Sequence, residues 1–179
     1  MNQQTFSLQT FPTEEYLPDI TITGNISRDH NRLTINYQLA GDLKQVVISS
    51  PADTPNRKDE LWQETCFEFF LGIKNSQHYW EFNLSPTGDW NIYHFDDYRQ
   101  GMQAETAFTK LPFRVQNQFD SFLLSVDIDL TQIIPPEQVL EVGITTVVKQ
   151  TDNHITYWAL THKGTAADFH LRNSFVIML

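Results

Sequence analysis

Two glutamates on neighbouring segments of the sequence have the types and spacing that could carry chemistry. Glu68 lies in the stretch 61–71 and Glu81 in the stretch 79–84, and both stretches alternate apolar and polar residues. If the two stretches pair as a hairpin, one register places the two carboxyl groups directly opposite each other. Retaining glycoside hydrolases use two carboxyl groups about 5 Å apart, one as acid and one as nucleophile. A glycoside hydrolase that uses Glu68 and Glu81 is therefore one hypothesis.

The same pair of glutamates has simpler explanations. Like charges directly opposite each other destabilise neighbouring strands, and a register shifted by two residues separates the charges without changing the face. Charged side chains are also common on the solvent-exposed face of an antiparallel sheet. A third alternative is that the charges are held for a ligand, and the sequence leaves all three open.

The stretch 61–99 positions these residues, because side chains on a strand alternate between the two faces of a sheet. One face of 61–71 is apolar, with Leu61, Phe67, Phe69 and Leu71, and the other face has Trp62, Glu64, Cys66 and Glu68. Trp62 is therefore predicted to project beside the glutamates, as the best candidate for a ligand-facing ring. Trp80 and Trp90 share the apolar parity and are predicted to lie in the core.

The rest of the chain continues as short strands separated by turn signals. Strands are predicted near Phe6 and over residues 19–28, 32–39, 45–49, 61–71, 79–84, 90–95, 108–115, 122–130, 140–149, 155–160 and 175–179. About ten to twelve strands without a long amphipathic helix are typical of an antiparallel β-sandwich or barrel. We find no internal repeat or linker and expect an all-β fold with a single domain over residues 1–179.

Composition excludes several partners. The 179 residues contain 12 basic and 22 acidic side chains, for a net charge of −10, without a Lys/Arg cluster. Binding to nucleic acid or to an anionic membrane is therefore not expected. The sequence contains no secretory signal and no apolar run of membrane-spanning length, so we expect a cytoplasmic protein. Cys66 is the single cysteine and is expected to be buried.

Sequence motifs for common catalytic sites are absent: there is no GxGxxG, Walker loop, HExxH or CxxC. His162, Asp168 and His170 lie close together in the segment THKGTAADFH and could form a metal site. The alternative, which we favour, is an irregular loop held in place by side-chain hydrogen bonds.

Two stretches resemble a known family. LWQETCFEFFLG…YWEFNLSPTGDWNIYHFDDYRQGM and YWALTHKGTAADFHLRNSF resemble bacterial DOMON-like proteins, which are relatives of the type 9 carbohydrate-binding modules. The resemblance implies a curved antiparallel β-sandwich in which tryptophan rings hold a sugar. Trp62 and Glu68 are similar to the tryptophan and glutamate of those modules, and Trp158 would supply a second ring. Asn83 and Arg99 are candidates by position.

The resemblance also bears on cofactors. Type 9 modules can contain structural calcium, which Asp96 and Asp97 could ligate, although a calcium-loop signature is lacking. Some DOMON relatives bind haem through methionine and histidine. Met1, Met102 and Met178 lie outside any haem-ligand context, so haem is not expected.

The chemistry of sugars agrees with these residues. The C–H faces of a sugar stack on aromatic rings, and its hydroxyl groups need donors and acceptors in fixed places. We therefore predict a non-catalytic carbohydrate-binding module, without a cofactor or metal at the site. Its predicted ligand-binding residues are Trp62, Glu64, Glu68, Glu81, Asn83, Arg99 and Trp158. Besides the hydrolase, the alternative is a protein-interaction domain that forms a homodimer through an exposed sheet face or edge.

Overall fold

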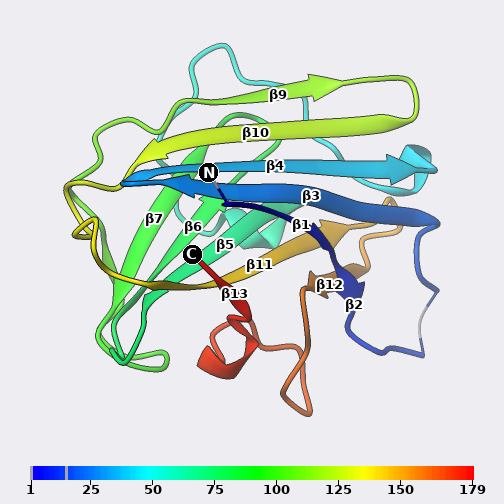
Figure 1. Cartoon of the computed structure of the whole chain (residues 1–179). Helices are drawn as coiled ribbons and strands as arrows, with labels where there is room; N and C mark the ends of the chain where they lie inside the picture. The colour runs from blue at the N-terminus through cyan, green and yellow to red at the C-terminus, as the bar shows by residue number, and fades with distance from the viewer. Residues whose placement is uncertain (1, 15) are drawn as a thin grey trace.

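The computed structural model describes residues 2–14 and 16–179 and consists of two antiparallel β-sheets packed face to face (Figure 1). The first sheet has the strand order β1 (Asn2–Ser7), β3 (Ile20–Asp29), β4 (Arg32–Gly41), β10 (Ser121–Asp129) and β9 (Phe113–Asn117). The second has the order β2 (Gln9–Thr10), β12 (Ile155–Ala159), β11 (Leu140–Lys149), β5 (Cys66–Ile73), β6 (Tyr79–Leu84), β7 (Trp90–Phe95) and β8 (Gln103–Ala104), and β13 (Ile177–Met178) also pairs with β11. The predicted antiparallel β-sandwich is confirmed, with thirteen strands in the described residues.

The main core lies between the sheets and follows from the alternation of the strands. Leu33, Ile35, Tyr37 and Leu39 on β4 are buried, whereas the residues between them are less so. Phe69 and Phe82 stack in the same core, with ring centroids 4.4 Å apart. Trp90 is buried there and Trp80 packs against it, so the predicted positions of these two tryptophans are confirmed.

Several predicted strands have different bounds, and the terminal strand predicted over 175–179 covers only Ile177–Met178. The strand predicted from residue 61 begins at Cys66, because residues 61–63 form the 3₁₀ turn η2 (Leu61–Gln63). The strand predicted over 45–49 is wrong: the 3₁₀ turn η1 (Leu43–Gln45) precedes Val46, which forms only an isolated bridge. The strand predicted over 108–115 is β9, which begins at Phe113, directly after Pro112.

The register between β5 and β6 resolves the arrangement of the glutamates. Glu68 lies opposite Asn83, and Phe70 lies opposite Glu81. This is the register shifted by two residues from the one that would place the two carboxyl groups opposite each other. Glu68 and Glu81 are therefore diagonal neighbours on one face of the sheet, as the alternative of a shifted register predicts.

The outer face of the second sheet is covered. Glu68, Glu81 and Asn83 are 2%, 5% and 0% exposed, so the alternative of a solvent-exposed face is wrong for these residues. The covering segment is the C-terminal stretch 161–176, which includes the 3₁₀ turn η3 (Arg172–Ser174). A second aromatic cluster lies beneath it, formed by Phe70, Tyr79, Tyr93, Phe95 and Phe175, with Trp62 and Phe169 packed against it.

Two glycines let this segment lie close to the strands. A Cβ added to Gly72 of β5 would come within 2.3 Å of Arg172 Cζ. A Cβ added to Gly143 of β11 would come within 2.8 Å of Phe175 Cδ1. Both distances are shorter than real side chains tolerate, so the glycines create the space that Arg172 and Phe175 occupy.

Two further predictions concern Cys66 and membrane-spanning segments. Cys66 is buried, as expected from its position among strand residues. In the described part of the chain, no helix has both the length and the apolar character that crossing a bilayer requires.

Candidate functional site

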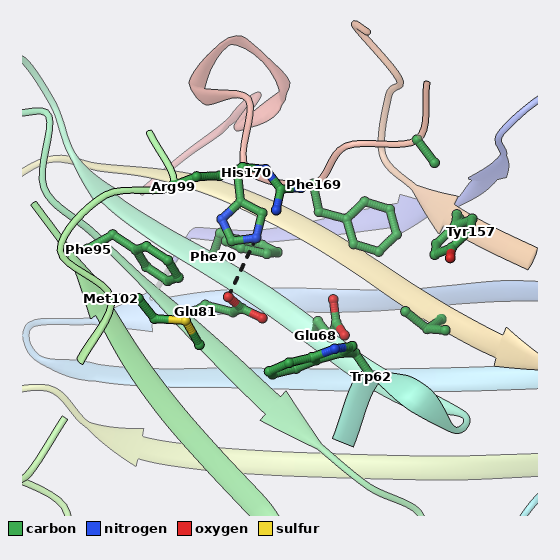
Figure 2. Close-up of a pocket in the computed structure, with 12 residues that line it drawn as sticks. Trp62, Glu68, Phe70, Glu81, Phe95, Arg99, Met102, Tyr157, Phe169 and His170 are labelled. Carbon is green, nitrogen blue, oxygen red and sulfur yellow. Dashed lines mark ion pairs between the residues drawn. The ribbon is translucent and has the colours of Figure 1, made fainter. Parts of the chain in front are cut away.

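A cavity of about 410 Å³ lies between the outer face of the second sheet and the C-terminal segment (Figure 2). Its floor comes from β5, β6 and β11, and its walls come from η2, the end of β7, residues 99–102, β12 and residues 167–170. It is lined by Trp62, Glu68, Phe70, Glu81, Phe95, Arg99, Met102, Val147, Tyr157, Ala167, Phe169 and His170. Tyr157 and Met102 are 40% and 47% exposed, which places them at the mouth.

Trp62 reaches this cavity from a turn and not from a strand. Glu60 has a φ of 59°, in the left-handed region, and the chain then forms η2 before it enters β5. The Trp62 ring packs edge-on against Tyr93, with centroids 5.9 Å apart. The Tyr93 hydroxyl in turn donates to Asp59 over 2.8 Å. These contacts fix the indole as one wall of the cavity, beside the two glutamates (Figure 2).

The Glu68 carboxyl group is buried with one oxygen unpartnered. Thr145 Oγ1 donates to Glu68 Oε2 over a long 3.4 Å, and Glu68 Oε1 has no hydrogen-bond partner in the structure. Burial raises the pKa of Glu68 well above its ordinary value, and the nearby charge of Glu81 raises it further. A buried acceptor without a donor is costly, so this oxygen has the character of a ligand contact.

Glu81 is held more firmly than Glu68. Asn83 Nδ2 donates to Glu81 Oε1 over 3.0 Å, so Asn83 acts through Glu81 from beside it on the same face of β6. Burial raises the pKa of Glu81 to about 7, while the hydrogen bond from Asn83 and the charge of Arg99 act in the opposite direction. The pair Glu68 and Glu81 thus retains protons at a pH where exposed carboxyl groups have lost them.

His170 faces Glu81 from the C-terminal segment. Its Nε2 lies 3.7 Å from Glu81 Oε2 (Figure 2), and its Nδ1 lies 2.9 Å from the Tyr79 hydroxyl oxygen. Burial lowers the pKa of His170 to about 4, and the charge of Arg99 also lowers it. The imidazole is therefore neutral near pH 7, and its contact with Glu81 is not an ion pair there. The Arg99 backbone N–H donates to the Tyr79 hydroxyl, which leaves the Tyr79 O–H free to donate to Nδ1.

Asp168 ties the C-terminal segment to the loop after β7. Arg99 Nη2 lies 2.9 Å from Asp168 Oδ1, and the Tyr98 hydroxyl donates to Asp168 Oδ2. The His170 backbone N–H also donates to Oδ1. Burial raises the pKa of Asp168, but these hydrogen bonds and the charge of Arg99 outweigh it and lower the pKa. The positive charge of Arg99 is thereby balanced by Asp168.

This arrangement decides between the two predictions for the segment 161–170. His162 Nε2 contacts the backbone oxygen of Gln9, whereas Asp168 and His170 take part in the contacts described above. The loop held by side-chain hydrogen bonds is confirmed. Within residues 2–14 and 16–179, no group of three or more His, Cys, Asp or Glu side chains could hold a metal ion.

The predicted site residues separate into three groups. Trp62, Glu68, Glu81 and Arg99 line the cavity, and Asn83 lies outside the lining but donates a hydrogen bond to Glu81. Glu64 is exposed and pairs with Lys149 over 2.5 Å, outside the cavity.

Trp158 also lies outside the cavity. It is 6% exposed, in the main core between the sheets, and its Nε1 donates to Thr156 Oγ1. The prediction of Trp158 as a second ligand-facing ring therefore needs correction. Its inward parity on β12 removes the ring from the outer face, where its neighbour Tyr157 lines the cavity instead.

Several residues that line the cavity are not among the ligand-binding residues predicted from the sequence. Phe70 shares the parity of Glu68, and Tyr157 has the parity opposite to Trp158, so alternation could have identified both. Phe169, His170 and Met102 come from segments without regular structure, where no period indicates a direction. Together the lining combines flat aromatic rings with buried carboxyl groups, an arrangement that can stack a small ring and accept its hydrogen bonds.

Comparisons with known proteins concern the fold. The sequence matches no protein-family model and no curated protein. The structure is similar to a candidate carbohydrate-binding protein from Bacteroides uniformis, with 12% identity, a TM-score of 0.72, and coverage of 97% of this chain and 84% of the other. It is also similar to a family 9 carbohydrate-binding module from Caldicellulosiruptor kristjanssonii solved with cellotriose, with 11% identity, a TM-score of 0.50, and coverage of 87% and 72%. The fold is thus one that carbohydrate-binding modules also adopt.

Proposed function

We propose that this protein is a non-catalytic carbohydrate-binding protein that holds a sugar in the cavity between the second sheet and the C-terminal segment. The observation that carries the proposal is that Glu68 lines a cavity walled by Trp62 and Phe169 (Figure 2), while its buried Oε1 has no hydrogen-bond partner. A sugar hydroxyl supplies the missing donor, and its C–H face packs against an aromatic ring.

The size of the cavity and the fold agree with this proposal. The volume of about 410 Å³ falls within the range of roughly 300–1,000 Å³ that is typical of small-molecule sites. Two similar structures are described as carbohydrate-binding, one of them with cellotriose bound. Because fold alone does not establish function, the proposal depends on the residues of the cavity.

A glycoside hydrolase is less well supported by the same residues. A retaining enzyme needs one ionised carboxylate as its nucleophile and one protonated carboxyl group as its acid. Burial raises the pKa of both Glu68 and Glu81, so neither is stabilised as the anion. The homodimer prediction concerns a different surface and stays a prediction.

Titration of mono- and oligosaccharides against tryptophan fluorescence tests the proposal. Binding should shift the emission to the blue, because a ligand that stacks on Trp62 removes water from that ring. By calorimetry, Trp62→Ala should weaken binding at least about tenfold, since it removes an aromatic anchor at the centre of the site. Trp80→Phe is the matched control, because Trp80 packs against the main core and its Nε1 donates to Glu105.

Two results would contradict the proposal. One is the absence of the expected effect, seen either as wild-type sugar affinity in Trp62→Ala or as no saccharide binding to the wild-type protein. The second is turnover of aryl glycosides that disappears in Glu68→Gln, which would instead support the hydrolase.

A further inference from the structure

We propose that the sugar bound in this cavity carries a protonated amino group, as an amino sugar does, and that the ammonium group binds between Glu68 and Glu81. This proposal rests on the carbohydrate-binding function proposed above and names its ligand class. It follows from the charges and hydrogen-bond partners of the cavity floor.

The floor offers acceptors without a compensating cation. Glu68 Oε1 has no partner, and Glu81 Oε2 faces His170 Nε2 at 3.7 Å, beyond hydrogen-bond distance. Arg99, the cationic side chain that lines the cavity, is half-exposed and paired with Asp168. Two buried carboxyl groups thus share one cavity, and the one lining guanidinium is neutralised by a third carboxylate.

An ammonium group matches this floor better than a hydroxyl group does. It is positively charged and has three donors and no acceptor, so it can compensate the charge of a glutamate that releases its proton on binding, which a neutral hydroxyl cannot do. Its hydrogen bonds to carboxylates are charge-assisted and about twice as strong as neutral ones. The faces of Trp62 and Phe169 also attract a cation that lies over them.

The same arrangement disfavours anionic sugars. A phosphate or carboxylate group would add negative charge to a floor with two buried carboxyl groups, and it would be repelled by whichever of Glu68 and Glu81 is ionised. Arg99 could bind such a group only by breaking its ion pair with Asp168. That ion pair links the C-terminal segment to the loop after β7. The chemistry of the floor therefore selects for a cationic sugar over a sugar phosphate or a uronic acid.

Calorimetric titration of wild-type protein with glucosamine and galactosamine, each against its neutral parent sugar, tests this ligand class. At about pH 6 the amine is protonated, and Glu81, with a pKa of about 7, still holds most of its proton. We expect each amino sugar to bind at least about tenfold more tightly than its parent. We also expect its binding to release protons, detected in buffers of different ionisation enthalpy, because an incoming cation lowers the pKa of both glutamates.

Other groups near the pair could contribute to this proton release and must be considered. The titratable and charged side chains that interact with the glutamates are Cys66, Tyr79, Tyr93, Arg99 and His170 on the same face, and Tyr37 from the main core. Asp168 acts on them through Arg99. Glu68→Gln and Glu81→Gln separate the two carboxyl groups from the rest. Each should reduce the proton release, and each should weaken binding of the amino sugar more than binding of the parent sugar, so that the preference falls. Glu64→Gln, an exposed acidic neighbour outside the cavity, should leave both unchanged.

The outcomes distinguish this proposal from the function on which it rests. If glucosamine and galactosamine bind no more tightly than glucose and galactose, and release no protons, the cationic ligand is wrong and the sugar site stands. If the preference is the same in Glu68→Gln and Glu81→Gln as in wild type, the ammonium does not bind between these residues and the proposal is also wrong. If no sugar of either kind binds, the carbohydrate function itself fails.

Discussion

At the scale of single residues, burial of Glu81 has a consequence for stability that does not depend on any ligand. Its pKa is raised from 4.5 to about 7 by burial. The folded protein therefore holds this proton at a pH where the unfolded chain has lost it. The stabilisation is fully present below the unfolded value and is lost as pH rises through the folded value.

We predict that wild-type protein loses stability relative to Glu81→Gln as pH rises from about 4.5 to about 7. The relative loss should be on the order of 2 kcal/mol, measured as the free energy of unfolding in urea across this range. His170 contributes the opposite slope, because its lowered pKa of about 4 favours the folded state as pH rises towards 6.5. The comparison with Glu81→Gln cancels this contribution, and a pH-independent difference between the two proteins would contradict the prediction.

The sequence identifies Trp62 correctly as a residue beside the glutamates, but the strand position predicted for it is wrong. Trp62 was placed beside the glutamates by counting along a strand, but residues 61–63 form a turn and the indole arrives by another route. Trp158 and Tyr157, in contrast, both lie within the strand β12, so alternation determines which of the two rings faces the cavity. Alternation is therefore informative only where the strand itself extends to the residue in question.

At the scale of elements, the C-terminal segment completes the cavity, and the sequence gives little indication of it. The strands β7 and β11 have the predicted bounds, since dense β-branched and aromatic residues alternate there. Residues 161–173 have no period, so their course is set by contacts with distant residues. Arg172 donates to the backbone oxygens of Ser76 and His78, and neighbouring Gly72 leaves room for it. Such contacts cannot be predicted from the local sequence, because they depend on the arrangement of the strands in the folded sheet.

We predict that Gly143→Ala loosens this segment. The new Cβ would meet Phe175 at 2.8 Å, so the ring must move away from β11. Overpacking of this kind costs about 1–3 kcal/mol in unfolding free energy, and hydrogen exchange of the amides in 161–176 should become faster. Because His170 and Phe169 belong to the same segment, sugar affinity should fall as well.

A compensating substitution provides the control for this prediction. Phe175→Leu reduces the volume that the new methyl group meets, so the double variant should be less destabilised than the sum of the two single variants. Strictly additive losses would show that Gly143 does not act through Phe175.

At the scale of the whole molecule, the net charge of −10 surrounds a cavity that is already rich in carboxyl groups. A protein field of one sign attracts ligands of the opposite sign and repels those of the same sign. The field reaches about 30 Å at 0.01 M salt and about 8 Å at 0.15 M salt. The acidic surface therefore favours a cationic sugar before it reaches Glu68 and Glu81, and added salt weakens this attraction.

We predict that affinity for an amino sugar falls several-fold between about 0.01 M and 0.15 M salt, whereas affinity for the neutral parent sugar stays constant. Calorimetry of glucosamine and glucose across this range measures both. In Glu68→Gln the salt dependence for glucosamine should decrease without disappearing, because the remaining surface charge still acts at a distance. Equal salt dependence for the two sugars would contradict the prediction, since a neutral ligand does not respond to screening of the protein's charge.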